Sequence, residues 1–139
     1  MSRENVELAL RYTAAVNARE VPEELLTPDF RIENVTTAVT DRVYHGAEGV
    51  RQWMSDFFDV LGEDARYEAR PIADGDDYVV GDIRIIGRGA ASGAPVELRH
   101  YGVMWARDGK IVRAVGYPTR RAALEADGLG QPREAGSHP

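Results

Sequence analysis

The stretch from Val96 to Tyr117 constrains the fold of this chain more than any other part of the sequence. It holds two runs rich in β-branched and aromatic residues, separated by Asp108-Gly109. A two-residue hairpin loop of type I′ needs a positive φ at both of its central residues, and Asp-Gly is a preferred pair there. The sequence therefore predicts an antiparallel hairpin around which the rest of the domain is built.

Counting back from the loop gives an expected register for this hairpin, because side chains alternate between the two faces of a sheet. One face is then expected to hold the pairs Ala106–Ile111, Met104–Arg113, Gly102–Val115 and His100–Tyr117. The other is expected to hold Tyr101, Val103 and Trp105 with Gly116, Ala114 and Val112. Neither face is polar throughout, so something must cover both.

Size and charge narrow the classes of function. The chain has 139 residues, enough for one domain with a core of its own, and it contains no cysteine, which excludes disulfides and thiolate chemistry. Its formal net charge of -6 argues against a nucleic-acid partner, because phosphate binding requires a basic surface. No apolar run approaches the about 20 residues that span a bilayer, and the first residues lack a signal-peptide pattern. We therefore expect a cytoplasmic protein without a membrane partner.

The spacing of apolar residues predicts the other elements. Helical spacing predicts helices over about 3–18, 23–26, 48–61 and 120–126, the last capped by Thr119. Alternation predicts strands at about 30–35, 66–73, 77–88, 96–106 and 111–117. Residues 36–45 show no apolar period and are expected to be a loop. Residues 1–129 are expected to form a single domain, and 130–139, with almost nothing apolar to bury, a disordered tail.

Helices early in the chain and a run of strands late predict an α+β fold. We expect a curved antiparallel β-sheet wrapped around the N-terminal helices, with all helices on one face of the sheet. Such an arrangement leaves a cone, and its open end is the expected place for an apolar pocket.

Several segments resemble the SnoaL-like, polyketide cyclase-like branch of the nuclear transport factor two-like superfamily. These segments are Arg11–Asn17, Pro28–Phe30, Tyr44–Val50, Arg107–Val112 and Arg120–Leu129. The resemblance implies the cone-shaped fold. It leaves the chemistry open, because the superfamily includes polyketide cyclases, ketosteroid isomerases, dehydratases, epoxide hydrolases and binders without catalytic activity.

The resemblance also implies roles for individual residues. Tyr12 matches the first-helix tyrosine that donates a hydrogen bond to a carbonyl oxygen in ketosteroid isomerases. Asn34 falls where those enzymes keep the aspartate that moves the proton, and Gly102 where related sequences carry a histidine or an aspartate. His100 lies two residues before Gly102 and therefore on the same face, so it is the candidate acid–base group beside Tyr12. A packed, hydrogen-bonded histidine and a core tyrosine are the alternatives for these two residues.

The wall of the pocket is expected to be aromatic and apolar. The candidate ligand-binding residues are Asn34, Trp53, Phe57, Met104 and Tyr117. Such residues also form ordinary cores, so some of them are expected to do both. No histidine pair or carboxylate cluster has metal-ligand spacing, and we expect neither a metal nor another cofactor.

The sequence is compatible with three functions. The protein could be a cyclase or isomerase that shifts a proton next to a carbonyl of an apolar substrate, with His100 as the base and Tyr12 stabilising the enolate. It could instead be a non-catalytic binder of an apolar small ligand, which Asn34 and Gly102 favour, or a dimeric interaction module. In each case we expect a homodimer through the outer face of the sheet, with Trp105 near the centre of the interface.

Overall fold

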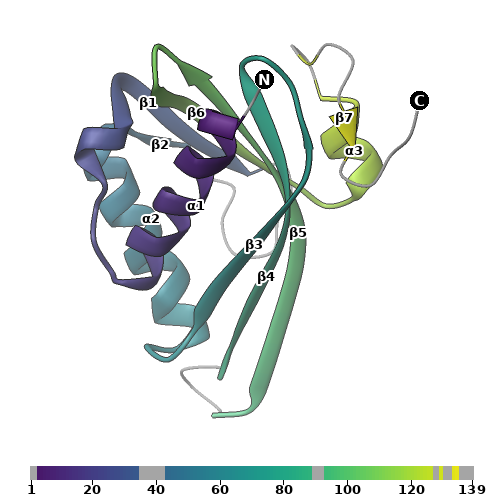
Figure 1. The fold of residues 1–139 in the computed structure, drawn as a ribbon. Helices are drawn as coiled ribbons and strands as arrows, with labels where there is room; N and C mark the ends of the chain where they lie inside the picture. The colour runs from purple at the N-terminus through teal and green to yellow at the C-terminus, as the bar shows by residue number, and fades with distance from the viewer. Residues whose placement is uncertain (1–2, 35–42, 89–92, 127–128, 130–132, 135–139) are drawn as a thin grey trace.

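A computed structural model describes residues 3–34, 43–88, 93–126, 129 and 133–134, the last pair by its backbone alone. Its elements are α1 (Arg3–Asn17), η1 (Glu23–Leu25), β1 (Leu26–Asn34), β2 (Tyr44–His45), α2 (Gly46–Leu61), β3 (Arg66–Asp74), β4 (Tyr78–Arg88), β5 (Pro95–Arg107), β6 (Lys110–Tyr117), α3 (Arg120–Leu124) and β7 (Arg133–Glu134). In this part of the chain seven strands form one sheet in the order β2-β1-β6-β5-β4-β3-β7. The sheet curves around α1 and α2, as Figure 1 shows, which confirms the predicted α+β fold. No helix among these residues is long and apolar enough to cross a membrane.

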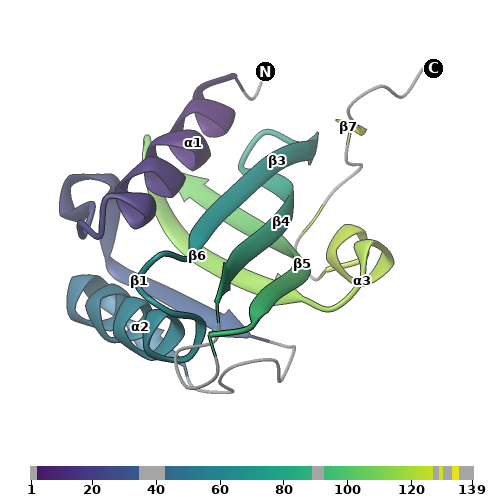
Figure 2. The same cartoon turned by 90° about the horizontal axis from the view of Figure 1, so that it is seen from below.

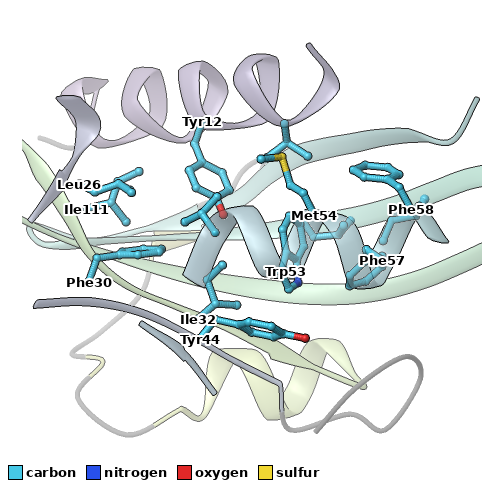
Figure 3. Close-up of a cluster of buried hydrophobic side chains, with 14 of the residues drawn as sticks. Tyr12, Leu26, Phe30, Ile32, Tyr44, Trp53, Met54, Phe57, Phe58 and Ile111 are labelled. Atoms are coloured by element: carbon cyan, nitrogen blue, oxygen red, sulfur yellow. The ribbon is translucent and has the colours of Figure 1, made fainter. Parts of the chain in front are cut away.

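The concave side of the sheet holds the larger core. Helix α1 buries residues four apart, Leu8, Tyr12 and Val16. Helix α2 buries a stripe that includes Trp53 and Phe57 and ends at Gly62, whose positive φ of 95° suits glycine. Figure 3 shows Tyr12, Trp53 and Phe57 in one cluster with Phe30 and Ile32 of β1. Burial of each large apolar side chain contributes roughly 1.5–3 kcal/mol, which fixes both helices against the sheet.

The β5–β6 hairpin has the predicted loop but not the predicted register. Asp108 and Gly109 both have positive φ, and Ala106 pairs with Ile111 as expected. Between Trp105 and Ala106, however, the register shifts by one residue. The pairs beyond the shift are Trp105–Arg113, Met104–Ala114, Val103–Val115, Gly102–Gly116 and Tyr101–Tyr117. A β-bulge of this kind exchanges the two faces of β6, so the predicted pairing of His100 with Tyr117 is wrong.

The convex face of the sheet has a cover of its own, contrary to our expectation that all helices lie on one side. Helix α3 packs there, on the side opposite α1 and α2 (Figure 2). Ala123 and Ala126 join one apolar cluster with Val103 and Trp105, which are only 1% and 8% exposed. The predicted cap is present, since the Thr119 hydroxyl accepts a hydrogen bond from the backbone N–H of Ala122 at 3.1 Å. Trp105 is therefore buried by its own chain.

Three chain segments differ from the sequence-based expectation. Strand β1 begins at Leu26 and runs parallel to β6, whereas the other pairings within the sheet are antiparallel. Tyr44–His45, expected in a loop, pairs with β1 as β2. Arg133–Glu134, expected in a disordered tail, pairs with the end of β3 as β7. The predictions for residues 35–42 and for the remainder of 130–139 fall outside the described residues.

Candidate functional site

A pocket opens on the concave side of the sheet, between α1, α2 and strands β1 and β3–β6. Its empty space is about 700 Å³, part of which is solvent at the open mouth. Most of the lining atoms are apolar, and among the described lining residues there is no Asp, Glu, Lys or Arg.

Five of the seven predicted site residues line this pocket: Tyr12, Asn34, Trp53, His100 and Met104. The other two lie elsewhere. Phe57 packs behind Trp53 in the core, with the ring centroids 4.9 Å apart. Tyr117 packs against the convex cluster, because the bulge in the hairpin turns it to that side. The predicted pocket wall therefore agrees with the observed lining on β5, and the prediction for β6 is wrong.

Two buried donors in the pocket have no partner among the residues that the structure describes. They are the indole Nε1 of Trp53 and the amide Nδ2 of Asn34. Trp53 is only 4% exposed, so its N–H cannot turn to bulk solvent. An unsatisfied buried donor costs about 1–3 kcal/mol, and native structures rarely leave one without a ligand or a water. A ligand or a water that reaches these two groups can therefore accept their hydrogen bonds.

Tyr67 of β3 also lines the pocket, although the sequence analysis did not select it. Its ring lies edge-on to Trp53 and to His100, with centroid distances of 5.8 Å and 6.5 Å. A signal for it exists in the sequence: charged residues occupy the even positions of Arg66-Tyr67-Glu68-Ala69-Arg70-Pro71. That alternation places Tyr67 on the apolar, inward face of the strand.

Burial controls the protonation of the polar groups in the pocket. It raises the pKa of the Tyr12 phenol above its ordinary value, helped by the neighbouring Tyr67, and it raises the pKa of Tyr67 in the same way. Burial lowers the pKa of His100 to about 4. At neutral pH the two phenols are therefore hydrogen-bond donors and the imidazole is an uncharged base.

Asn34 and His100 approach one another over Gly116. A Cβ atom at Gly116 would lie 2.9 Å from Oδ1 of Asn34 and 3.7 Å from Nε2 of His100. The parallel pairing of β1 with β6 places Asn34 beside Gly116, and the hairpin places His100 on the far side. The site thus combines an imidazole, an amide, an indole N–H and two phenols in apolar surroundings, a set that can hold a carbonyl oxygen and move a proton.

A second polar cluster lies on the convex side, away from the pocket. The Asp82 carboxylate, 7% exposed, accepts hydrogen bonds from Arg99 at 2.8 Å and from Arg70 at 3.1 Å. The hydrogen bond from Arg99 is the main cause that holds the pKa of Asp82 below its usual value. Arg84 pairs with Glu97 at 3.3 Å. Within the described parts of the chain, no group of three or more His, Cys, Asp or Glu side chains is placed to hold a metal ion.

Comparisons with known proteins place this fold and pocket in context. A protein from Jannaschia sp. CCS1 that was assigned as a SnoaL-like polyketide cyclase is 18% identical, with a TM-score of 0.68 over 88% of this chain and 92% of the other. TerC, crystallised with polyporic acid, is 20% identical, with a TM-score of 0.70 over 88% and 99%. SalBIII, an epoxide hydrolase/cyclase-like enzyme in pyran ring formation in the polyether salinomycin, is 17% identical, with a TM-score of 0.66 over 87% and 96%. At these identities the likeness shows the fold alone.

The sequence itself gives a family. No curated protein matches it. The family model of the SnoaL-like domain matches residues 9–114, which include Tyr12, Asn34, Trp53, Tyr67 and His100. Since that match covers most of the chain and the observed fold agrees with it, the chain belongs to the SnoaL-like domain family.

Proposed function

We propose that this protein binds an apolar small molecule through a carbonyl oxygen and shifts a proton next to that carbonyl, as a cyclase or an isomerase does. One observation carries the proposal: Trp53 and Asn34 line a pocket that has no charged residue among its described lining, and each holds a buried donor without a partner among the described residues. A carbonyl oxygen satisfies such donors with its two lone pairs and brings no charge to desolvate.

His100 is the group that takes the proton. An unprotonated imidazole nitrogen removes it from the carbon next to the carbonyl, and the electron pair of that C–H bond forms the C=C bond of an enolate. The carbonyl π pair moves onto oxygen, where the Tyr12 hydroxyl donates a hydrogen bond to it. Return of the proton to another carbon gives an isomer. In a ring closure the enolate carbon instead attacks a second carbonyl, and His100 protonates the resulting alkoxide.

Because His100 is a weak base, most of the rate acceleration must come from stabilisation of the enolate. With a pKa of about 4, the imidazole is a weak base, so the pocket must stabilise the enolate strongly for the transfer to proceed. The phenols of Tyr12 and Tyr67 remain protonated, which keeps them available as donors. The imidazolium and the enolate form together, so the apolar site never holds one unpaired charge.

A non-catalytic binder of the same ligand class is the second candidate. It is favoured by the absence of any carboxylate among the described lining residues and by the depressed pKa of His100. The related structures support a ligand in such a fold without separating the two candidates: TerC was crystallised with polyporic acid, and SalBIII acts in pyran ring formation.

Hydrogen–deuterium exchange separates the two functions. The probe is 2-tetralone in D₂O, a bicyclic ketone whose C1 protons are acidified by the aromatic ring, and exchange is followed by proton NMR. We expect the protein to accelerate exchange and the variant His100→Gln to lose about 10²-fold or more of that acceleration, while the Kd changes little. Tyr12→Phe should also slow exchange. His45→Gln, at an exposed histidine outside the pocket, is the matched control and should behave like the wild type.

The contrary results are distinct. Acceleration that survives in His100→Gln removes His100 as the base. Tight binding of 2-tetralone without acceleration by the wild type selects the non-catalytic binder. Absence of binding to the wild type rejects both functions for this ligand class.

A further inference from the structure

A row of residues without bulky side chains crosses the floor of the pocket. Gly81 of β4 pairs with Gly102 of β5, and Gly102 pairs with Gly116 of β6. Pro71 on β3 and Asn34 on β1 continue this row at its two ends. All five residues line the pocket. At this level β4 and β5 present backbone without a side chain to the cavity, while the Asn34 amide lies over Gly116 of β6.

Glycine inside a strand weakens the strand, so each of these positions needs a reason. None of the three glycines has a positive φ. At Gly116 the reason lies in the protein, because an added Cβ would press on the Asn34 amide at 2.9 Å. A strand glycine without such a reason often marks the close approach of another backbone or of a ligand.

Gly81 and Gly102 lack an internal reason of this kind. A Cβ added at Gly81 would have its nearest contact at 3.5 Å and one at Gly102 at 3.6 Å, both to the side chain of Ile83. These are ordinary van der Waals distances. At Gly87, further along β4, a Cβ would instead lie 2.8 Å from the carbonyl oxygen of Leu61. The fold thus requires a glycine at Gly87 and has room for a methyl group at Gly81 and Gly102.

We infer that Gly81 and Gly102 determine specificity by keeping the pocket floor flat for a planar ring. The ring of a conjugated cyclic ketone lies face-on against the bare backbone of β4 and β5. Its carbonyl edge then points along the row towards Asn34 and His100. The inference rests on the proposed binding of a carbonyl ligand, and it adds the shape of that ligand and two residues that select it.

A pair of ketones tests the inference. 9-Fluorenone and benzophenone have the same number of carbon atoms and one carbonyl each, but fluorenone is flat and benzophenone is twisted. Titration calorimetry on the wild type should show fluorenone binding about tenfold or more tighter than benzophenone, which corresponds to a modest overpacking penalty. Gly81→Ala and Gly102→Ala should each weaken fluorenone binding about tenfold and abolish the preference.

The melting temperature of the same variants provides the second measurement. Gly81→Ala and Gly102→Ala should melt about 1–4 °C higher than the wild type, because alanine restricts the unfolded chain and fits the folded one. The matched control Gly87→Ala should melt lower and keep the preference for fluorenone. A lower fluorenone affinity together with a higher melting temperature is the result expected if these two glycines serve ligand binding and not the stability of the fold.

Four results overturn the inference. Unchanged fluorenone affinity in Gly102→Ala shows that the floor does not touch the ring. Lower melting temperatures for both variants, as for Gly87→Ala, assign the glycines to the curvature of the sheet. If the wild type binds both ketones with equal affinity and Tyr12→Phe binds neither, the pocket binds carbonyl compounds but does not select planar ones. A wild type that binds neither ketone rejects the proposed function itself, and this inference with it.

Discussion

The side-chain amide of Asn17 bonds both backbone polar groups of Tyr67. Asn17 Nδ2 donates to the Tyr67 carbonyl oxygen, and the Tyr67 N–H donates to Asn17 Oδ1, each at 2.8 Å. The last residue of α1 thereby takes the place of a neighbouring strand at the edge of β3, where β7 pairs only with Ala73 and Asp74. This contact fixes Tyr67 at the pocket and closes part of an open sheet edge.

Replacing Asn17 should therefore cost stability. We expect Asn17→Ala to lower the free energy of unfolding by about 2 kcal/mol, since it removes two hydrogen bonds and leaves two half-buried backbone groups without their partner. Urea denaturation measures the change. Asn5→Ala is the matched control on the same helix, because Asn5 makes one exposed hydrogen bond, to the carbonyl of Asp76, and its loss should cost less than about 0.5 kcal/mol. Equal losses in the two variants would show that the Asn17 contact has no special weight.

Trp53 has a structural and a binding role that two substitutions separate. Trp53→Ala should cost about 3–5 kcal/mol of stability, because the indole is buried against Phe57 and Tyr67. Trp53→Phe keeps most of the ring and removes the N–H, so it should cost less stability but weaken the binding of 2-tetralone. Denaturant midpoints measure the change in stability, and titration calorimetry measures the change in affinity for 2-tetralone. The control is Phe57→Leu, which should lower stability and leave the affinity for 2-tetralone nearly unchanged. If Trp53→Phe binds 2-tetralone as tightly as the wild type, the indole N–H does not take part in binding.

His100 should make the protein less stable in mild acid. Its pKa is about 4 in the folded state against about 6.5 in the unfolded chain, so between these values the unfolded state binds more protons. The stability associated with the neutral imidazole is complete above about pH 6.5 and is lost progressively as the pH falls to 4, by about 3 kcal/mol in total.

Urea denaturation from pH 7 to pH 4 tests this dependence. The measured quantity is the difference in pH slope between the wild type and His100→Gln, because acidic groups titrate in both proteins and cancel. His100→Gln should show a flatter profile, and His45→Gln the same profile as the wild type. Identical slopes for wild type and His100→Gln would mean that the imidazole protonates as readily in the folded state as in the unfolded one.

A homodimer through the outer sheet face remains a prediction, but Trp105 cannot be its centre. One exposed part of that face is the charged cluster on β3–β5, where Arg70 and Arg99 flank Asp82. We expect a dimer held there to dissociate as salt concentration rises and to weaken in Arg70→Glu. Arg51→Glu on α2 is the control, since the side chains of Arg70 and Arg51 are similarly exposed, 73% and 58%. Sedimentation velocity decides, and a monomeric wild type at low salt would reject the dimer.

Local patterns in the sequence determined most of the elements. The four-residue spacing on α1, the apolar stripe of α2 and the alternation in β3 and β5 each reflect which side of one element is buried, and such patterns can be read along the chain. The Asp108-Gly109 loop was predictable for the same reason, because its residues meet a local demand for positive φ. Trp53 was found because α2 carries a clear apolar stripe, whereas Tyr12 and His100 were selected through the resemblance to ketosteroid isomerases.

Only the tertiary structure decided what these elements meet. One extra residue in β6 turned Tyr117 outward, and no local pattern signals such a bulge, because both faces of the hairpin are apolar. The parallel pairing of β1 with β6 brought Asn34 to Gly116, and α3 covered Trp105 instead of a second molecule. These contacts join residues far apart in sequence, and their free energy depends on the packing of the whole domain, so the pocket is a property of the folded chain and not of any one segment.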